Sequence, residues 1–464
     1  MMSTGARKIV IGLVMAGAGV IALPALAQKQ TPPVGGAPKA FTVPAHETYA
    51  LGNGMKVTLV PYGNIPKVTV SLSLRSGNID EVAEQLGVAD ITGELLKEGT
   101  ATLSSKEVAE AAARMGSTLG VTVGADETTV AMDVLSESGA AAVKLLADVV
   151  QHPLLPESEL ARLKTNALRQ IAVAKTQPSQ IALARFRKLM YGEHPYGDVL
   201  PTEESINKLT IADAKKFYTS NYGAARAHLY VAGKFDAAAV KKAIAENFSG
   251  WAKGSAPVVR AAAPKTQRIL DVTDRPGAPQ STLYVGLPVA DPTSADNVRL
   301  IVSNSLLGGS FASRITTNIR EQKGYTYSPR SQVSNRYHDA YWVEIADVTT
   351  KDTGASLKEI FGEIARLQKE APGAEELKGT QSYLSGIFVI QNSTRQALIG
   401  QLRFVDLQGL GEEYLKTYVK RVNAVTPEEV QATTAKYVKP ELMTIVVVGD
   451  KAKISEQLTP YAGK

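Results

Sequence analysis

Cysteine is absent from the 464 residues of this chain. The lack of thiols excludes disulfide bonds, thiol catalysis and cysteine-based zinc sites. A strong charge of one sign is also lacking, because 51 basic residues against 45 acidic residues give a formal net charge of only +6. This balance is too mild to indicate binding of nucleic acid.

Histidine is scarce, and its few residues are scattered. The five histidines are His46, His152, His194, His228 and His338, and no two lie within five positions of each other. Two histidines that grip one metal ion from a single helix are typically four residues apart. The sequence therefore predicts that no helix presents a histidine pair to a metal, and that His194 is a packed or capped turn residue.

Long apolar runs occur only at the N-terminus. Two basic residues at 7–8 precede an apolar stretch at 9–23, and the small residues Ala25 and Ala27 follow. This order is typical of a secretory signal peptide, and we expect cleavage after Ala27. A retained membrane anchor is the alternative, although the stretch is shorter than the roughly 20 residues that a span needs. Removal of residues 1–27 lowers the formal net charge from +6 to +4, because it takes away two basic residues and no acidic one.

The rest of the chain has the composition of an ordinary globular protein, with 44% hydrophobic and 21% charged residues. Alternation of apolar and polar residues predicts strands, and apolar residues at helical spacing predict helices. Ser104 and Glu107 form a capping-box pattern that opens a helix, and Gly116 follows it as a stop. The mixture predicts an α+β fold. The predicted strands are 57–60, 68–74, 119–123 and 128–135, and the predicted helices are 108–115, 139–151 and 157–174.

The two halves of the chain match each other. Thr210 opens a helical pattern that an apolar strand follows, ending at Gly233; Thr426 and Gly449 repeat this order with the same spacing of 23 residues. Chance similarity is the alternative to duplication of a domain of roughly 200 residues. Duplication predicts two homologous α/β-sandwich domains, at 46–253 and 266–464, which follow a flexible lead at 28–45 and are joined by a linker at 254–265.

The segment at 87–100, GVADITGELLKEGT, carries a resemblance to a known family. It resembles the first helix of the M16 (insulinase-like) metallopeptidases, whose pattern is Gly-x-Ala-His-x-x-Glu-His followed by Gly-Thr. In that pattern the two histidines bind zinc, and the glutamate acts as general base on the zinc-bound water. The segment HPYG at 194–197 is also similar to a family motif, which strengthens the alignment.

The side chains of the zinc motif are replaced in this chain. The first histidine position is Asp90, the glutamate position is Gly93, and the second histidine position is Glu94. The third zinc ligand of the family, a glutamate on a later helix, falls on Gln170. The resemblance therefore implies a degenerate site that binds no zinc of its own. A hard cation on Asp90 and Glu94 is the alternative, but the segment supplies no further oxygen ligands.

A second segment, at 306–328, resembles the signature of the C-terminal half of the family: LLGGSFASRITTNIREQKGYTYS. In the family, an arginine and a tyrosine of this segment bind the peptide carbonyl opposite the zinc. The resemblance implies this role for Arg320 and Tyr327, with Tyr325 as a competing candidate, as donors to the oxyanion of a composite active site. The alternative is that Arg320 pairs with a carboxylate and that the tyrosines pack against the sheet.

Glycines in the same segment have two interpretations. In related two-subunit peptidases, a Gly-rich segment of the partner subunit helps to handle substrate, which implies a substrate-binding role for Gly308, Gly309 and Ser310. A glycine pair can also serve only close packing or a turn.

The resemblance covers nearly the whole chain after the signal peptide, and extends to the non-catalytic partner of heterodimeric M16 peptidases and to the alpha-type subunits of mitochondrial processing peptidase. It implies a periplasmic, substrate-binding subunit whose paralogous partner carries the intact His-x-x-Glu-His motif and the zinc. We expect a peptide substrate, no nucleic acid, and no membrane span after signal cleavage. A scaffold protein with no role in proteolysis is the alternative, whereas the scattered histidines oppose a stand-alone peptidase with a displaced metal site.

Overall fold

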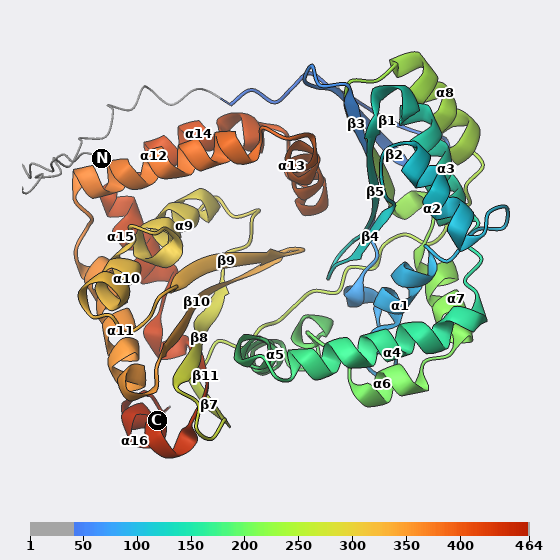
Figure 1. Ribbon diagram of the computed structural model, residues 1–464. Coiled ribbons are helices and arrows are strands. Elements are labelled where there is room, and N and C mark those ends of the chain that lie inside the picture. Colours follow the sequence, from blue (N-terminus) through green and yellow to red (C-terminus); the bar gives the residue numbers. More distant parts are fainter. Residues whose placement is uncertain (1–40, 463–464) are drawn as a thin grey trace, which may run out of the picture. The chain divides into compact units, whose positions relative to one another are not determined.

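Two β-sheets form the framework of the protein, for which a computed structural model describes residues 41–462. The first sheet has six strands in the order β1-β2-β6-β3-β5-β4, and the second has five in the order β7-β11-β8-β10-β9 (Figure 1). The strands of the first sheet are β1 (Glu47–Ala50), β2 (Lys56–Pro61), β3 (Lys67–Leu74), β4 (Gly120–Val123), β5 (Thr128–Leu135) and β6 (Ala227–Gly233). The strands of the second are β7 (Ile269–Asp274), β8 (Gln280–Val289), β9 (Arg330–Arg336), β10 (Asp339–Thr349) and β11 (Thr444–Gly449).

Both sheets have the same connectivity. In the first, β6 pairs parallel with β2 and antiparallel with β3; in the second, β11 pairs parallel with β7 and antiparallel with β8. The helix before each of these strands, α7 (Ile211–Asn221) or α15 (Pro427–Tyr437), starts with a threonine capping box, at Thr210 or Thr426. The structure therefore supports the duplication that the repeated spacing predicts, and the α+β fold is confirmed.

Helices cover the sheets and close their cores. The helices of the first half are α1 (Val88–Leu95), α2 (Ser105–Arg114), α3 (Gly139–Gln151), α4 (Glu157–Ala174), α5 (Pro178–Tyr191), α6 (Glu203–Lys208), α7 and α8 (Ala237–Phe248). Those of the second are α9 (Asn297–Asn304), α10 (Arg314–Thr316), α11 (Thr353–Lys369), α12 (Ala374–Gln391), α13 (Arg395–Gln408), α14 (Glu413–Ala424), α15 and α16 (Lys451–Leu458). Strand β5 and helices α3 and α4 begin and end at the predicted residues. The capping box of Ser104 and Glu107 is confirmed, although its helix α2 begins at Ser105, earlier than the predicted 108.

One helix from each half packs against the sheet of the other half. Helix α5 contacts β8 and β11 of the second sheet, where the ring of Phe186 lies 5.6 Å from that of Tyr341. Helix α13 contacts β3 and β6 of the first sheet, and its Arg395 bonds to Asp133 at 3.0 Å. Apolar periodicity predicts that a helix has a buried face, but it does not say which sheet covers that face. Each half therefore contributes one helix to the packing of the other half, on the far side of the linker at 254–265.

The start of the described chain is also packed. Phe41 contacts Phe388 edge to face at 4.9 Å, and Val43 is buried in the core of the second half. The predicted signal peptide and cleavage site lie outside the described residues. Between residues 41 and 462, no helix combines the length and the hydropathy that a membrane span requires.

We predict that Phe186→Ala lowers the free energy of unfolding by about 3–5 kcal/mol, because it removes a fully buried ring from the contact between α5 and the second sheet. Urea unfolding followed by circular dichroism measures the change. Ile390→Ala is the control, since the Ile390 side chain is exposed and its loss should cost no more than about 0.5 kcal/mol. Equal effects of the two substitutions would contradict the packing role of α5.

Candidate functional site

The structure brings together, around one cavity, the four residues that the resemblance aligns with the zinc motif. Asp90, Gly93 and Glu94 lie on α1, and Gln170 lies on α4. All four line a cavity of about 590 Å³ whose third wall is the edge strand β4. The spacing of the three α1 residues puts them on one face of the helix. The chain has therefore kept the geometry of a site between α1 and α4.

Glu81 stabilises the start of α1, and no sequence motif predicts this role. One of its carboxylate oxygens accepts hydrogen bonds from the backbone N–H groups of Gly87, at 3.1 Å, and Ala89, at 2.9 Å. A carboxylate at a helix N-terminus satisfies donors that have no partner within the helix. Burial raises the pKa of Glu81 to about 7. Its role depends on a tertiary contact, so no local motif marks it.

The donor groups around the cavity do not fit zinc. Asp90 accepts a hydrogen bond from the Asn78 side chain at 2.9 Å, and Glu94 forms an ion pair with Lys97 at 2.7 Å. Gly93 has no side chain, and the Gln170 amide is neutral, which makes it a poor zinc ligand. Within residues 41–462, no three side chains of histidine, aspartate or glutamate are grouped so that they could hold a metal ion.

The position of the family's general base is closed sterically. A Cβ atom at Gly93 would lie 2.7 Å from the Val123 Cγ2 atom and 3.4 Å from the Val121 Cγ1 atom, both on β4. A glutamate at this position requires α1 and β4 to move apart, or Val123 to change rotamer. The replacement of glutamate by glycine is therefore coupled to the close packing of α1 on β4.

The histidines have structural roles where the structure shows their contacts. The Nδ1 atom of His194 accepts from the Tyr196 N–H at 3.2 Å and caps a short 3-10 helix, which confirms the predicted turn role. His228 contacts the Asp406 carboxylate at 3.1 Å and stacks on Tyr230. None of the five histidines lines the cavity between α1 and α4.

A second candidate feature lies in the other half. The Arg320 guanidinium is stacked between two aromatic rings, with its central carbon 4.3 Å from the centre of Phe311 and 4.9 Å from the centre of Tyr327. The two rings are strongly exposed, Phe311 by 68% and Tyr327 by 77%. Stacking of this kind holds the guanidinium plane and leaves its edges for hydrogen bonds. The sequence did not single out Phe311, because only the fold brings it to Arg320.

The contacts expected if Arg320 and the two tyrosines had only structural roles are also partly present. Arg320 forms an ion pair with its neighbour Glu321 at 3.0 Å through Nε. Tyr325 packs against the core of the second half, unlike the exposed Tyr327. Of the two tyrosines, Tyr327 is thus the exposed one beside Arg320, and the substrate-binding role of either stays a prediction. Neither Arg320 nor Tyr327 lines the cavity between α1 and α4.

Two π-helical turns, Ser305–Gly309 and Thr317–Gln322, carry the glycine pair and Arg320. Such turns are rare in proteins overall, and those that occur are often found at functional sites. Both glycines are closely packed: a Cβ atom at Gly308 would lie 2.6 Å from Glu344 Oε2, and one at Gly309 would lie 2.4 Å from Asn304 Nδ2. This contact supports the packing interpretation of the pair, and substrate binding by Gly308, Gly309 and Ser310 stays a prediction.

Glu344, on β10, is an ionisable group beneath this segment. It is fully buried, and neither carboxyl oxygen meets a hydrogen-bond donor at bonding geometry in the described part of the chain. Burial raises the pKa of Glu344 well above its ordinary value, and Arg330 offsets only part of this effect. Burial therefore favours the neutral form of this carboxyl, since an unpaired buried charge is far more costly.

Two sequence profiles of one peptidase family match most of the chain. The profile of the insulinase family (peptidase family M16) matches residues 57–202, and the profile of the peptidase M16 inactive domain matches residues 208–384. The chain belongs to the M16 peptidase family.

Curated relatives cover most of the chain at low identity. The "uncharacterized zinc protease YmxG" of Bacillus subtilis is 25% identical over 384 residues, covering 82% of this chain and 93% of the relative. The "non-peptidase homolog YmxG" of Helicobacter pylori is 22% identical over 411 residues, covering 86% of this chain and 94% of the relative. The M16 relatives of this chain thus include proteins named as proteases and one named as a non-peptidase.

Solved structures share the fold. A peptidase M16 inactive domain from Pseudomonas fluorescens superposes with a TM-score of 0.81 at 25% identity, over 87% of this chain and 98% of that one. The first half of the periplasmic protease PqqL from Escherichia coli superposes with a TM-score of 0.73 at 16% identity, over 92% of this chain and 98% of that one. The second likeness shows the fold alone.

We predict that Gly93→Ala lowers the free energy of unfolding by about 1–3 kcal/mol, because the added methyl group overpacks the contact between α1 and β4. Adding Val123→Ala should recover most of the loss, since it removes the Cγ2 atom that lies 2.7 Å away. Urea unfolding of both variants measures the coupling. Gly379→Ala, in α12 with open space around it, is the control and should stabilise by about 0.5–1 kcal/mol. Additive effects at positions 93 and 123 would contradict the steric argument.

We predict that Glu344→Gln becomes increasingly stabilising, relative to the unsubstituted chain, as the pH rises. Above the ordinary glutamate pKa of 4.5, the unfolded chain loses this proton while the folded chain keeps it. The free energy of unfolding of the unsubstituted chain therefore falls by up to about 1.4 kcal/mol per pH unit until the folded pKa is reached. The glutamine has no proton to lose, so this fall disappears.

Urea unfolding of both proteins between about pH 5 and about pH 8 measures this difference. Glu246→Gln, on the exposed side of α8, is the control and should show a difference that changes little with pH. A constant difference for Glu344→Gln over the same range would contradict a neutral buried carboxyl.

Proposed function

We propose that this chain is the non-catalytic, substrate-binding subunit of a heterodimeric, zinc-dependent M16 peptidase in the periplasm. Its partner is a paralogous M16 subunit that carries an intact His-x-x-Glu-His motif and the zinc. The substrate is a peptide, and this chain donates Arg320 and Tyr327 to a composite active site.

The observation that carries the proposal is the cavity between α1 and α4. Four of its lining residues, Asp90, Gly93, Glu94 and Gln170, align by the resemblance with the family's zinc ligands and base, but they do not form a zinc donor set. Without imidazoles and a base around one ion, the site cannot generate a metal-bound hydroxide at neutral pH. Peptide hydrolysis with this subunit therefore requires another chain's metal.

The stack of Phe311, Arg320 and Tyr327 supports the substrate-binding role. A guanidinium held between two rings is pre-positioned, and its terminal N–H groups are free to donate to a carbonyl oxygen. A phenol and a guanidinium that donate to a developing oxyanion stabilise the tetrahedral intermediate. A donor to a substrate must be accessible from solvent, and Tyr327 is 77% exposed.

The edge of the first sheet supports a peptide ligand. Strand β4 pairs only with β5, and its residues Val121 to Val123 line the cavity between α1 and α4. An open strand edge can take an extended peptide by main-chain hydrogen bonds, which are insensitive to sequence.

Relatives and the N-terminal sequence support the remaining parts of the proposal. The Helicobacter pylori relative is named as a non-peptidase, and the structure that covers 92% of this chain is half of a periplasmic protease. The pattern of basic, apolar and small residues at 7–27 supports export to the same compartment.

We predict that Arg320→Lys and Tyr327→Phe each lower the kcat of the heterodimer by about 100-fold while leaving the association of the subunits unchanged, because each removes a donor to the oxyanion. The measurement is hydrolysis of a quenched fluorescent peptide by the complex with the zinc-bearing paralogue, with analytical ultracentrifugation for association. The matched controls are Arg421→Lys, on an arginine that also stacks on a tyrosine, and Tyr383→Phe, on another exposed tyrosine; both should keep full activity.

The isolated chain supplies the second arm of this test. It should hydrolyse no peptide, with or without a chelator, whereas a chelator should abolish the activity of the heterodimer. Activity of the chain alone that a chelator removes would overturn the proposal. Unchanged kcat in both Arg320→Lys and Tyr327→Phe complexes would support a scaffold protein instead.

A further inference from the structure

A surface groove lies between α2 and α3, apart from both features described above. It has a volume of about 630 Å³ and is closed by the loop at Thr102 and Leu103 and by Asn247 of α8. It shares no lining residue with the cavity between α1 and α4. Any ligand of this groove is therefore independent of the degenerate zinc positions.

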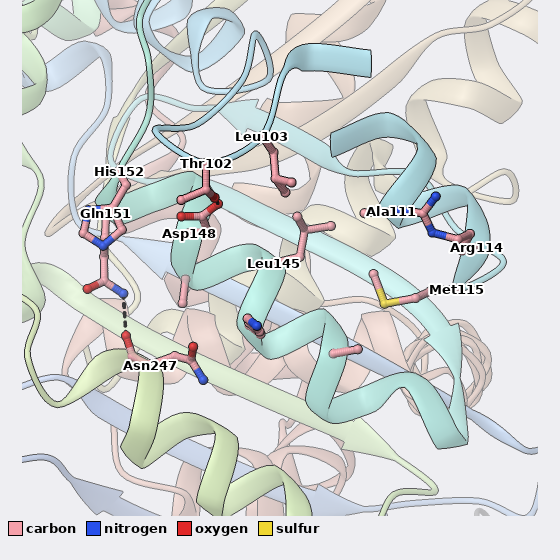
Figure 2. A pocket seen from close by; sticks show the side chains of 13 residues that line it. Thr102, Leu103, Ala111, Arg114, Met115, Leu145, Asp148, Gln151, His152 and Asn247 are labelled. Atoms are coloured by element: carbon pink, nitrogen blue, oxygen red, sulfur yellow. Dashed lines mark hydrogen bonds between the residues drawn. The ribbon is translucent and has the colours of Figure 1, made fainter. Parts of the chain in front are cut away.

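The walls of the groove are stripes of two helices in which apolar residues alternate with charged and polar ones. Residues at i, i+3 and i+4 of α2 face the groove, and so do residues at i, i+3, i+4 and i+7 of α3. Leu103 and Leu145 lie in the middle of the groove, between Met115 on one side and Asp148 on the other (Figure 2). The lining residues are Thr102, Leu103, Ala111, Arg114, Met115, Ala141, Lys144, Leu145, Ala147, Asp148, Gln151, His152 and Asn247.

The charged groups of the groove favour an anion. Lys144 forms no ion pair with any described residue, and Arg114 has only a long contact of 3.8 Å with Glu110. The one acidic group, Asp148, already accepts hydrogen bonds from the hydroxyls of Thr100, at 2.6 Å, and Thr102, at 2.9 Å. Both bonds end on the Oδ2 atom of Asp148, and two cations against this one carboxylate leave the lining with a net positive charge.

The two ends of the groove differ in chemistry. Figure 2 shows Arg114 beside Met115 at one end, and Gln151 with His152 at the other. The Gln151 side chain is occupied, because it donates to the Asn247 carbonyl at 2.8 Å. The stripe of α3 from Ala141 to Gln151 is about 15 Å long at the rise of an α-helix, which suits a single medium-length hydrocarbon chain.

We infer that this groove binds a single-chain amphiphile with an anionic head group, of the fatty-acid type. The hydrocarbon tail lies along Leu103, Leu145 and Met115, where burial of methylene groups supplies most of the affinity. The carboxylate pairs with the cations of the lining, Arg114 or Lys144. The volume, the apolar side chains of the lining and its net positive charge together distinguish this ligand from a peptide strand, which needs unpaired backbone groups along its length.

Decanoate is the probe that tests this inference, used with the full chain and below its micelle concentration. We predict that isothermal titration calorimetry gives saturable binding of one decanoate, with a Kd about tenfold below that of decyltrimethylammonium, because only the anion pairs with the two cations. Arg114→Ala combined with Lys144→Ala should raise the Kd for decanoate about tenfold. Ala111→Phe should abolish binding by filling the groove.

Lys106→Ala is the matched control, since Lys106 lies on α2 outside the groove and its loss should leave the Kd unchanged. Cosedimentation with phosphatidylglycerol vesicles separates a free acid from a membrane lipid as the source of the chain. Binding of dissolved decanoate supports the inference, whether the natural ligand is a free fatty acid or part of a membrane lipid. Equal affinity for decyltrimethylammonium, retention of binding in Ala111→Phe, or attachment to vesicles without binding of dissolved decanoate would overturn it.

Discussion

The close approach of α1 to the edge strand β4 is the constraint on which the first candidate site depends. It is made by Gly93, where a single methyl group would come within 2.7 Å of Val123. This contact sets the position of the cavity wall. Under the proposed function, the residue that stands in place of the family's base is also the one that permits this packing, because the strand fills the space that a longer side chain needs.

A similar coupling of packing and chemistry occurs in the second half. The bare Gly308 lets a π-helical turn lie on the carboxyl of Glu344, and burial there raises the pKa of this carboxyl well above its ordinary value. The next π-helical turn carries Arg320, whose guanidinium is held by two exposed rings. Burial thus disfavours the charged form of Glu344 below the segment, whereas the permanent charge of Arg320 lies at its surface. Under the proposed function, that surface charge is the part that meets substrate.

The sequence predicts the local elements well and the tertiary contacts poorly. Strand β5 and helices α3 and α4 were predicted at their observed ends, because alternation and helical spacing depend only on neighbouring residues. The meeting of Asp90 with Gln170 followed from the family resemblance, since no periodicity connects residues on separate helices. Phe311 and Glu344 carried no local signal: one matters because a distant arginine stacks on it, and the other because the fold leaves it without a partner.

Division of a site between two chains has a physical consequence that a single-chain enzyme lacks. If this subunit supplies the oxyanion donors and its partner supplies the metal, neither chain alone lowers the barrier for hydrolysis by much, because effects of groups that act on one transition state are not additive. Activity then follows the concentration of the complex. Phe311 and Tyr327, exposed at 68% and 77%, are apolar surface that the isolated chain leaves in contact with water. Covering such surface favours association, so the rings that hold Arg320 also favour the complex in which it acts.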